Sequence, residues 1–116
     1  MKNTYPTQPS ARAKGKTHRR YIAARFVSAR VKQEIPQKVQ NGMWLMLEML
    51  PVEPDCLIAY WLFPEEGGVS ITQKQHLPEY HRTIRMTIAV PSCAIYVVDE
   101  DDRYTMMFHE EFNEVW

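Results

Sequence analysis

Carboxylates gather in one short run of the sequence, Asp99-Glu100-Asp101-Asp102, which Arg103 follows. Closely spaced carboxylates offer the oxygen ligands that a hard cation such as Ca²⁺ takes. The run does not match the Asp-x-Asp-x-Asp-Gly spacing of an EF-hand loop. A solvated hairpin turn is therefore the favoured interpretation, and the same turn could present a negative patch to a basic partner.

The histidines and cysteines show neither the spacing of a metal site nor that of a catalytic pair. Zinc usually takes paired cysteines or a helical His-x-x-x-His, and both patterns are missing. A nucleophilic cysteine needs a base that a third group holds in place. Cys93 follows a proline and a serine, but nothing in the sequence brings His76, His81 or His109 to it. We therefore expect no metal, no cofactor and no enzymatic activity.

Basic residues gather at the start of the chain. Residues 1–40 hold ten Lys and Arg and one Glu (+9), whereas residues 41–116 hold four Lys and Arg and thirteen acids (−9). Such a split indicates a polyanion-binding arm. The alternative left open is that the arm lies on its own acidic body, because charge governs association and not fold. The predicted polyanion-binding residues are Lys14, Lys16, Arg19, Arg20, Arg25 and Arg30.

Aromatic residues supply the other binding signals. Tyr21 directly follows the basic cluster, and an aromatic ring stacked on a base contributes about 1–3 kcal/mol. Trp44 and Trp61 lie in apolar runs and are predicted core residues, although Tyr60 or Trp61 would be exposed if the sheet has an open face. The terminal Trp116 is a predicted interface anchor. The predicted partner-binding residues are Asp99, Glu100, Asp101, Asp102 and Trp116.

The length of 116 residues fits one domain with an arm. Apolar residues make up 45% of the chain, which argues against disorder. The apolar stretch Met43–Leu50 is interrupted by Glu48 and is too short to cross a membrane. The first residues lack an apolar leader, and two cysteines without a pairing pattern suit a reducing cytoplasm. We expect residues 1–20 to form a flexible basic arm and residues 21–116 a single domain in the cytoplasm.

Hydrophobic periodicity predicts one strand, one helix and five further strands. Tyr21–Val31 is rich in small and β-branched residues and is the predicted first strand. Glu34-Ile35-Pro36 is typical of a helix start, and apolar residues recur at helical spacing until Pro51. His109–Trp116 is left open between a short helix and an extended tail. The remaining predicted strands are Cys56–Phe63, Val69–His76, Thr83–Val90, Ala94–Val98 and Tyr104–Phe108.

These elements predict an α+β domain in which one helix packs on a mainly antiparallel sheet of five to six strands. The predicted order is β-α-β-β-β-β-β after the basic N-terminal arm, and short links favour a meander. Gly42 lies in the middle of the predicted helix, where glycine costs about 1 kcal/mol relative to alanine. A close helix–sheet contact would explain it.

A series of short motifs runs in order through Arg25–Phe112. They are Glu34-Ile35-Pro36, Met43-Trp44-Leu45, Gly68-Val69, Gln75 with Pro78-Glu79-Tyr80, Ile95-Tyr96-Val97-Val98-Asp99, Tyr104-Thr105-Met106-Met107 and Glu110-Glu111-Phe112. Together they resemble the domain-of-unknown-function family 960 of Gram-positive bacteria and their mobile elements. The resemblance implies a small α+β fold and brings no catalytic residue or cofactor. The arm exceeds the usual start of the family, and the acidic turn lacks the expected glycine.

We therefore expect a small non-enzymatic interaction protein, encoded by a phage or mobile element, that binds a protein machine handling nucleic acid. Inhibition of a host defence such as a CRISPR effector is one concrete form, and it depends on family context and size. The alternative is direct, sequence-independent binding of RNA or DNA through the basic arm. A third hypothesis is a small hydrolase that uses Cys93 with a histidine. No membrane association is expected, and the oligomeric state stays open.

Overall fold

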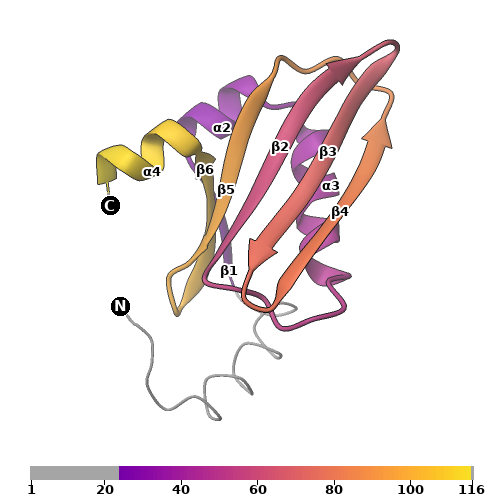
Figure 1. The fold of residues 1–116 in the computed structure, drawn as a ribbon. Helices are drawn as coiled ribbons and strands as arrows, with labels where there is room; N and C mark the ends of the chain where they lie inside the picture. Colours follow the sequence, from indigo (N-terminus) through magenta and orange to yellow (C-terminus); the bar gives the residue numbers. More distant parts are fainter. Residues whose placement is uncertain (1–23, 116) are drawn as a thin grey trace.

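The structure, a computed structural model, describes residues 24–115, which form a six-stranded sheet with three helices. Figure 1 shows α2 and α3 behind the sheet and α4 beside β5 and β6. The α+β class is confirmed, and α2 and α4 add to the one helix predicted. In chain order the elements are β1 (Ala24–Val27), α2 (Ala29–Glu34), α3 (Gln37–Glu48), β2 (Leu57–Glu65), β3 (Gly68–His76), β4 (Glu79–Met86), β5 (Cys93–Asp99), β6 (Arg103–Phe108) and α4 (His109–Val115).

The strands lie side by side in the order β1-β6-β5-β2-β3-β4. All neighbouring pairs are antiparallel except β1 with β6, which is parallel, so the sheet is mixed. The predicted meander is wrong, because β5 pairs with β2 and β6 and not with β4. The apolar strand β5 thereby gains two neighbours, which satisfy its backbone hydrogen-bonding groups.

The segment between β4 and β5 crosses the end of the β2–β3 hairpin, and Gly68 makes room for it. A Cβ atom built on Gly68 would lie 2.0 Å from the carbonyl oxygen of Met86 and 3.1 Å from the Cα of Thr87. No side chain fits at such a distance. The crossover therefore depends on a glycine at position 68.

The predicted first strand, Tyr21–Val31, is wrong in its second half, because α2 replaces the strand after Val27. The hydroxyl of Ser28 caps the helix by accepting a hydrogen bond of 3.1 Å from the backbone N–H of Val31. Val31 and Ile35, four residues apart, are then both buried. A cap and two buried side chains outweigh the weak β preference of this segment.

Helix α3 was predicted correctly, and its buried residues follow the expected spacing: Val39, Met43, Met46 and Leu47. Gly42 lies where the helix approaches the sheet, because a Cβ there would be 3.0 Å from the Sδ of Met86 on β4. The predicted close helix–sheet contact at Gly42 is thus confirmed. Buried Gln40 joins α3 to the end of α2 by donating to the carbonyl of Ile35 at 2.8 Å.

The hairpin of β3 and β4 is tighter than predicted. Strand β4 was expected to start at Thr83, but it starts at Glu79, because buried Gln75 closes the turn. The amide of Gln75 donates to the carbonyl oxygens of Pro78 (2.7 Å) and Glu53 (3.0 Å), and its oxygen accepts from the N–H of Asp55 (3.0 Å). One side chain therefore holds both the hairpin and the segment that leads into β2.

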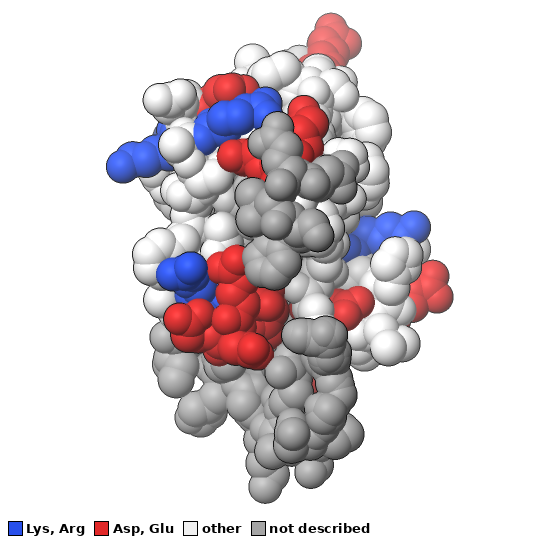
Figure 2. Space-filling view, turned by 90° about the vertical axis from the view of Figure 1, so that its left-hand side faces the viewer, with Lys and Arg blue, Asp and Glu red and all other residues white. Residues whose placement is uncertain are grey.

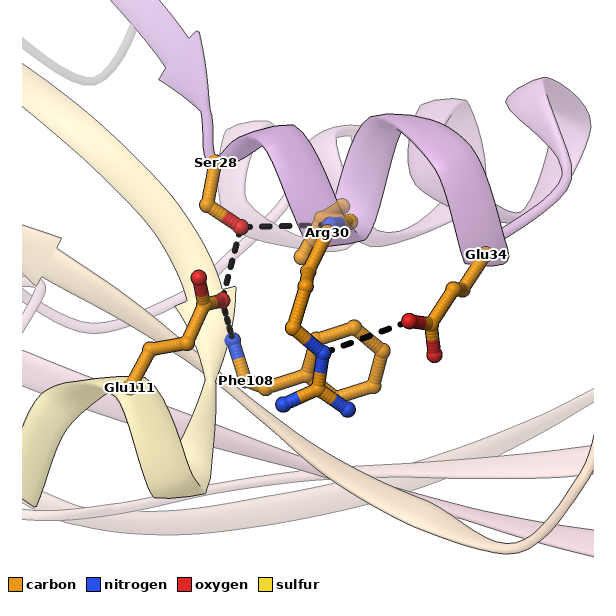
Figure 3. Close-up of polar contacts among 6 residues, drawn as sticks. Ser28, Arg30, Glu34, Phe108 and Glu111 are labelled. Carbon is orange, nitrogen blue, oxygen red and sulfur yellow. Dashed lines mark hydrogen bonds and ion pairs between the residues drawn. The ribbon is translucent and has the colours of Figure 1, made fainter.

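Helix α4 begins at a cap that also involves α2, and Figure 3 shows this cluster. The carboxylate of Glu111 accepts hydrogen bonds from the backbone N–H of Phe108 (2.9 Å) and from the hydroxyl of Ser28 (2.7 Å). The first bond is the reciprocal half of a capping box. The rings of His109 and Phe112 then meet Tyr96 of β5 edge-on. Helix α4 thus packs on the sheet face opposite α2 and α3.

Candidate interaction surfaces

The predicted acidic turn exists, and the structure brings its four carboxylate residues together between β5 and β6. The backbone N–H of Glu100 donates to the carbonyl of Arg103 at 2.8 Å, and that of Asp102 donates to the carbonyl of Glu100 at 2.9 Å. Asp101 has a φ of 73°, in the left-handed region that aspartate tolerates better than most residues. Glycine adopts such a φ without steric cost, but this turn contains no glycine.

Two of these carboxylates hold the turn. The side chain of Asp99 accepts from the N–H of Asp101 at 2.9 Å. One carboxylate oxygen of Glu100 accepts from the Nε of Arg103 (3.0 Å) and from the hydroxyl of Thr105 (2.6 Å). The hydrogen bond with Glu100 raises the pKa of Arg103, whose guanidinium also lies 4.8 Å from the centre of the exposed Phe26 ring.

The acidic turn (residues 99–102) therefore carries four acidic side chains, and among residues 24–115 Arg103 is the adjacent cation that pairs with it. Figure 2 shows acidic side chains gathered in a patch on the side of the molecule that carries β6 and α4. The described chain begins beside this turn, because Ala24 of β1 pairs with Arg103 of β6. The sequence places Arg19 and Arg20 only a few residues before that point.

Most of the predicted polyanion-binding residues, and Trp116, lie outside the described residues: Lys14, Lys16, Arg19, Arg20 and Trp116. The two that are described have partners within the fold. Arg25 on β1 forms an ion pair with Glu48 and lies 5.4 Å from the centre of the Trp44 ring. Arg25 thereby joins β1 to the end of α3. Its binding to a polyanion stays a prediction.

Arg30 on α2 is similarly engaged (Figure 3). Its guanidinium lies 4.0 Å from the centre of the Phe108 ring, and its Nε is 3.3 Å from the carboxylate of Glu34. The hydrogen bond with Glu34 is the main cause that raises the pKa of Arg30, and Glu110 and Glu111 add to it. These contacts reduce the charge that Arg30 offers to an external phosphate, and such binding stays a prediction.

A second surface, which the sequence offered only as an alternative without its residues, is the helix-free face of β2, β3 and β4. Tyr60 is buried against α3 and donates to the carbonyl of Met43 at 3.1 Å, whereas its neighbour Trp61 points the other way and is 39% exposed. Phe63 on the same face is 51% exposed. The prediction of Trp61 as a core residue is therefore wrong, and the stated alternative, an open sheet face, holds.

The apolar run Cys56–Phe63 could not reveal this by itself, since every residue in it is apolar or aromatic. The available signal lay in the partner strand. Ser70, Thr72 and Lys74 alternate with apolar or buried residues on β3, and antiparallel pairing places Thr72 opposite Trp61. A polar face on one strand predicts an open face on its neighbour.

The arrangement around Cys93 does not resemble a catalytic pair. Burial, with a smaller contribution from Glu110, raises the pKa of Cys93 to about 11, so the thiol is protonated near neutral pH. Cys93 packs toward the core on the same face as Ile95, whereas His109 contacts Tyr96 on the opposite face. His81 lies on β4 in register with Lys74, and β2 and β3 separate β4 from β5.

No group of three His, Cys, Asp or Glu side chains in residues 24–115 is arranged to hold a metal ion. A shallow depression beside the β2–β3 turn is lined by prolines, glycines and small residues, with Glu65 as its charged side chain. No helix in the described part of the chain is both long enough and apolar enough to cross a bilayer.

Fold and surfaces together define a small α+β domain with a mixed sheet, an open sheet face and an acidic turn. The chain belongs to the family described as staphylococcal protein of unknown function (DUF960), whose model matches residues 24–111. The family expected from the sequence motifs is thereby confirmed. Residues 1–23 precede the matched range.

Comparison with solved and curated proteins supports the fold alone. A crystal structure described as the protein of unknown function from Enterococcus faecalis is similar, with a TM-score of 0.69 and 20% sequence identity. The similarity covers 77% of this chain and 90% of that one. No curated protein matches the chain.

Proposed function

We propose that this chain is a non-enzymatic interaction protein whose acidic turn binds a basic surface on a protein that handles nucleic acid. Proteins that grip nucleic acid carry Lys and Arg on the contact surface, and clustered carboxylates are complementary to such a surface. The single observation that carries the proposal is the gathering of Asp99, Glu100, Asp101 and Asp102 on one hairpin turn.

The proposal of a non-enzymatic role has separate support. The residues that carried the family resemblance have structural tasks: Gln75 closes a hairpin, Glu111 caps α4, and Gly68 admits a crossing segment. The high pKa of Cys93 disfavours a thiolate nucleophile. Narrower forms of the proposal are a phage or mobile-element origin, a place in the cytoplasm and the inhibition of a CRISPR effector.

The test is recovery of a partner from nuclease-treated bacterial lysate with tagged full-length protein. Asp99 and Glu100 hold the turn, so the test variant carries Asp101→Asn and Asp102→Asn. We expect the native chain to retain a stoichiometric basic protein, and the variant to lose about tenfold in affinity, because each of the two lost exposed charge pairs costs about 0.7 kcal/mol. A matched control, Glu66→Gln with Glu79→Gln, changes net charge equally at exposed sites away from the turn.

Two results would count against this function. One is that no stoichiometric protein remains after nuclease treatment. The other is that the turn variant recovers the partner as well as the control does.

The second candidate function is sequence-independent binding of RNA or DNA by the arm, which the +9 charge of residues 1–40 favours. Deletion of residues 1–20 would then abolish binding of duplex DNA, and the affinity of the intact chain would fall steeply with salt. Binding that survives the deletion excludes the arm as the carrier.

A further inference from the structure

The open face of β2, β3 and β4 has a regular layout that the strand register defines. One row across the three strands consists of Trp61, Thr72 and Thr83, and the next consists of Phe63, Ser70 and Arg85. The hydroxyls of Thr72 and Thr83 lie 2.8 Å apart. Helix α4 covers Tyr96 on β5. The exposed residues of the two rows are Trp61, Phe63, Thr83 and Arg85, whereas Thr72 is half-buried and Ser70 is buried.

The two aromatic residues of this face lie two positions apart on one strand. Their Cα atoms are therefore separated by about 7 Å along β2. Trp61 and Phe63 remain 39% and 51% exposed, which is unusual for large apolar side chains side by side in a folded domain. Exposed rings on a sheet face form a platform on which single-stranded nucleic acids stack their bases, and here α2 and α3 lie behind that face (Figure 1).

The charge of the neighbouring hairpin fits the same ligand. Residues 68–86 (β3, β4 and their turn) hold Lys74, Arg82 and Arg85 and one acid, Glu79. The rest of the segment 41–116 holds one cation and twelve acids. Lys74 and Arg85 belong to the open face, and Arg85 is 64% exposed and pairs with Glu65 at 2.7 Å. Lys74 and Arg85 therefore bring two cations to the face of the aromatic pair, where Glu65 and Glu79 are the acids.

We propose that this open face binds a single strand of RNA or DNA, with Trp61 and Phe63 stacking on two bases and Lys74 and Arg85 contacting the phosphates. The hydroxyls of Thr72 and Thr83 lie between these groups and offer hydrogen bonds to a base or a sugar. A duplex does not fit, because its bases are already stacked and paired. The proposal is independent of the acidic turn and of the arm.

The test is fluorescence anisotropy of labelled oligo-dT and oligo-U of about 12 nucleotides with the full-length chain. We expect Trp61→Ala with Phe63→Ala to weaken single-strand binding by about tenfold or more, and to leave duplex binding unchanged. Lys74→Ala and Arg85→Ala are each expected to reduce the slope of log binding constant against log salt concentration by about 0.7. The control is Leu45→Ala, an exposed apolar residue of α3 in the other layer.

Folding of each variant is checked by its thermal midpoint, and Trp61→Leu with Phe63→Leu replaces the alanine variant if that variant unfolds. The proposal is overturned if the native chain shows no single-strand binding below about 100 µM. It is also overturned if the aromatic variants bind as tightly as the native chain, or if the Leu45 control loses as much affinity. If the face binds a protein and not a nucleic acid, the anisotropy of the labelled oligonucleotides will not change as the chain is added, and the proposal is overturned.

Discussion

Ser28 donates a hydrogen bond of 2.7 Å to Glu111, although 83 residues separate them in the sequence. Each residue caps a helix: Ser28 accepts from the N–H of Val31 at the start of α2, and Glu111 accepts from the N–H of Phe108 at the start of α4. The bond therefore joins the first and last described helices through their caps (Figure 3). Helices on opposite faces of the sheet are held in one arrangement by it.

This relationship predicts energetic coupling between the two residues. Ser28→Ala should lower the free energy of unfolding by about 1 kcal/mol through loss of a cap. Glu111→Ala should lower it by about 1–3 kcal/mol, because two donors lose their acceptor. In a double-mutant cycle measured by urea unfolding, the double variant should lose less unfolding free energy than the sum of the losses in the two single variants. Additive losses, or an equal loss for the exposed neighbour Glu110→Ala, would contradict a direct bond.

Gly68 is predicted to be the least replaceable residue of the β2–β3 turn. Gly68→Ala should lower the free energy of unfolding by at least about 2 kcal/mol, because the new Cβ would lie 2.0 Å from the carbonyl oxygen of Met86. Gly67→Ala is the control: its φ of +79° is strained for alanine, but no atom lies within 4 Å, so about 1 kcal/mol is expected. Equal losses in thermal or urea unfolding would show that the close approach does not matter.

Asp101 is predicted to be the strained position of the acidic turn. Its φ of 73° disfavours branched side chains, so Asp101→Val should lower the free energy of unfolding by about 1–2 kcal/mol. Asp101→Gly should leave stability unchanged or raise it, because glycine adopts this φ without steric cost. Asp102→Val, at the adjacent position without a positive φ, should change stability by less than about 0.5 kcal/mol. Identical effects of the two valine variants in urea unfolding would be inconsistent with strain at Asp101.

The raised pKa of Cys93 predicts both low reactivity and a pH-dependent stability. In a Cys56→Ser background, alkylation by iodoacetamide should be slow at pH 8 and should rise with an apparent pKa of about 11. The unfolded chain ionises this thiol near pH 8.5, so its contribution to stability is present below that pH and is lost as the pH rises toward 11. Cys93→Ala should remove this part of the alkaline loss. Fast alkylation at pH 8 would contradict burial as the cause.

Local patterns predicted the elements that have local causes. The apolar spacing from Val39 to Leu50 predicted α3, and the turn residues predicted the hairpins. The predicted strand Tyr21–Val31 was wrong in its second half, because the Ser28 cap and the burial of Val31 stabilise helix α2 there. The predicted start of β4 was wrong because the buried side chain of Gln75 holds the turn through Pro78 and also bonds to Glu53, 22 residues away, and the local pattern does not show that Gln75 is buried.

The acidic turn was the part of the candidate surfaces that the sequence revealed directly, since four adjacent carboxylates remain adjacent in any fold. The sequence did not reveal the residues of the open aromatic face, because its rows combine residues from three strands that only the register brings together. The basic cluster Lys14, Lys16, Arg19 and Arg20 and the terminal Trp116 lie outside the described residues, so their roles remain sequence-based predictions.

The order of residues alone determined the family, the α+β class, the main helix and the division of charge between the two ends of the chain. These properties depend on composition and on contacts within a few residues, which the linear pattern records. Only the tertiary structure decided which face of β2 is covered, where β5 pairs, and that Arg25 and Arg30 have partners within the fold. Those outcomes depend on contacts between segments far apart in the chain, where packing and shape complementarity select one arrangement among many.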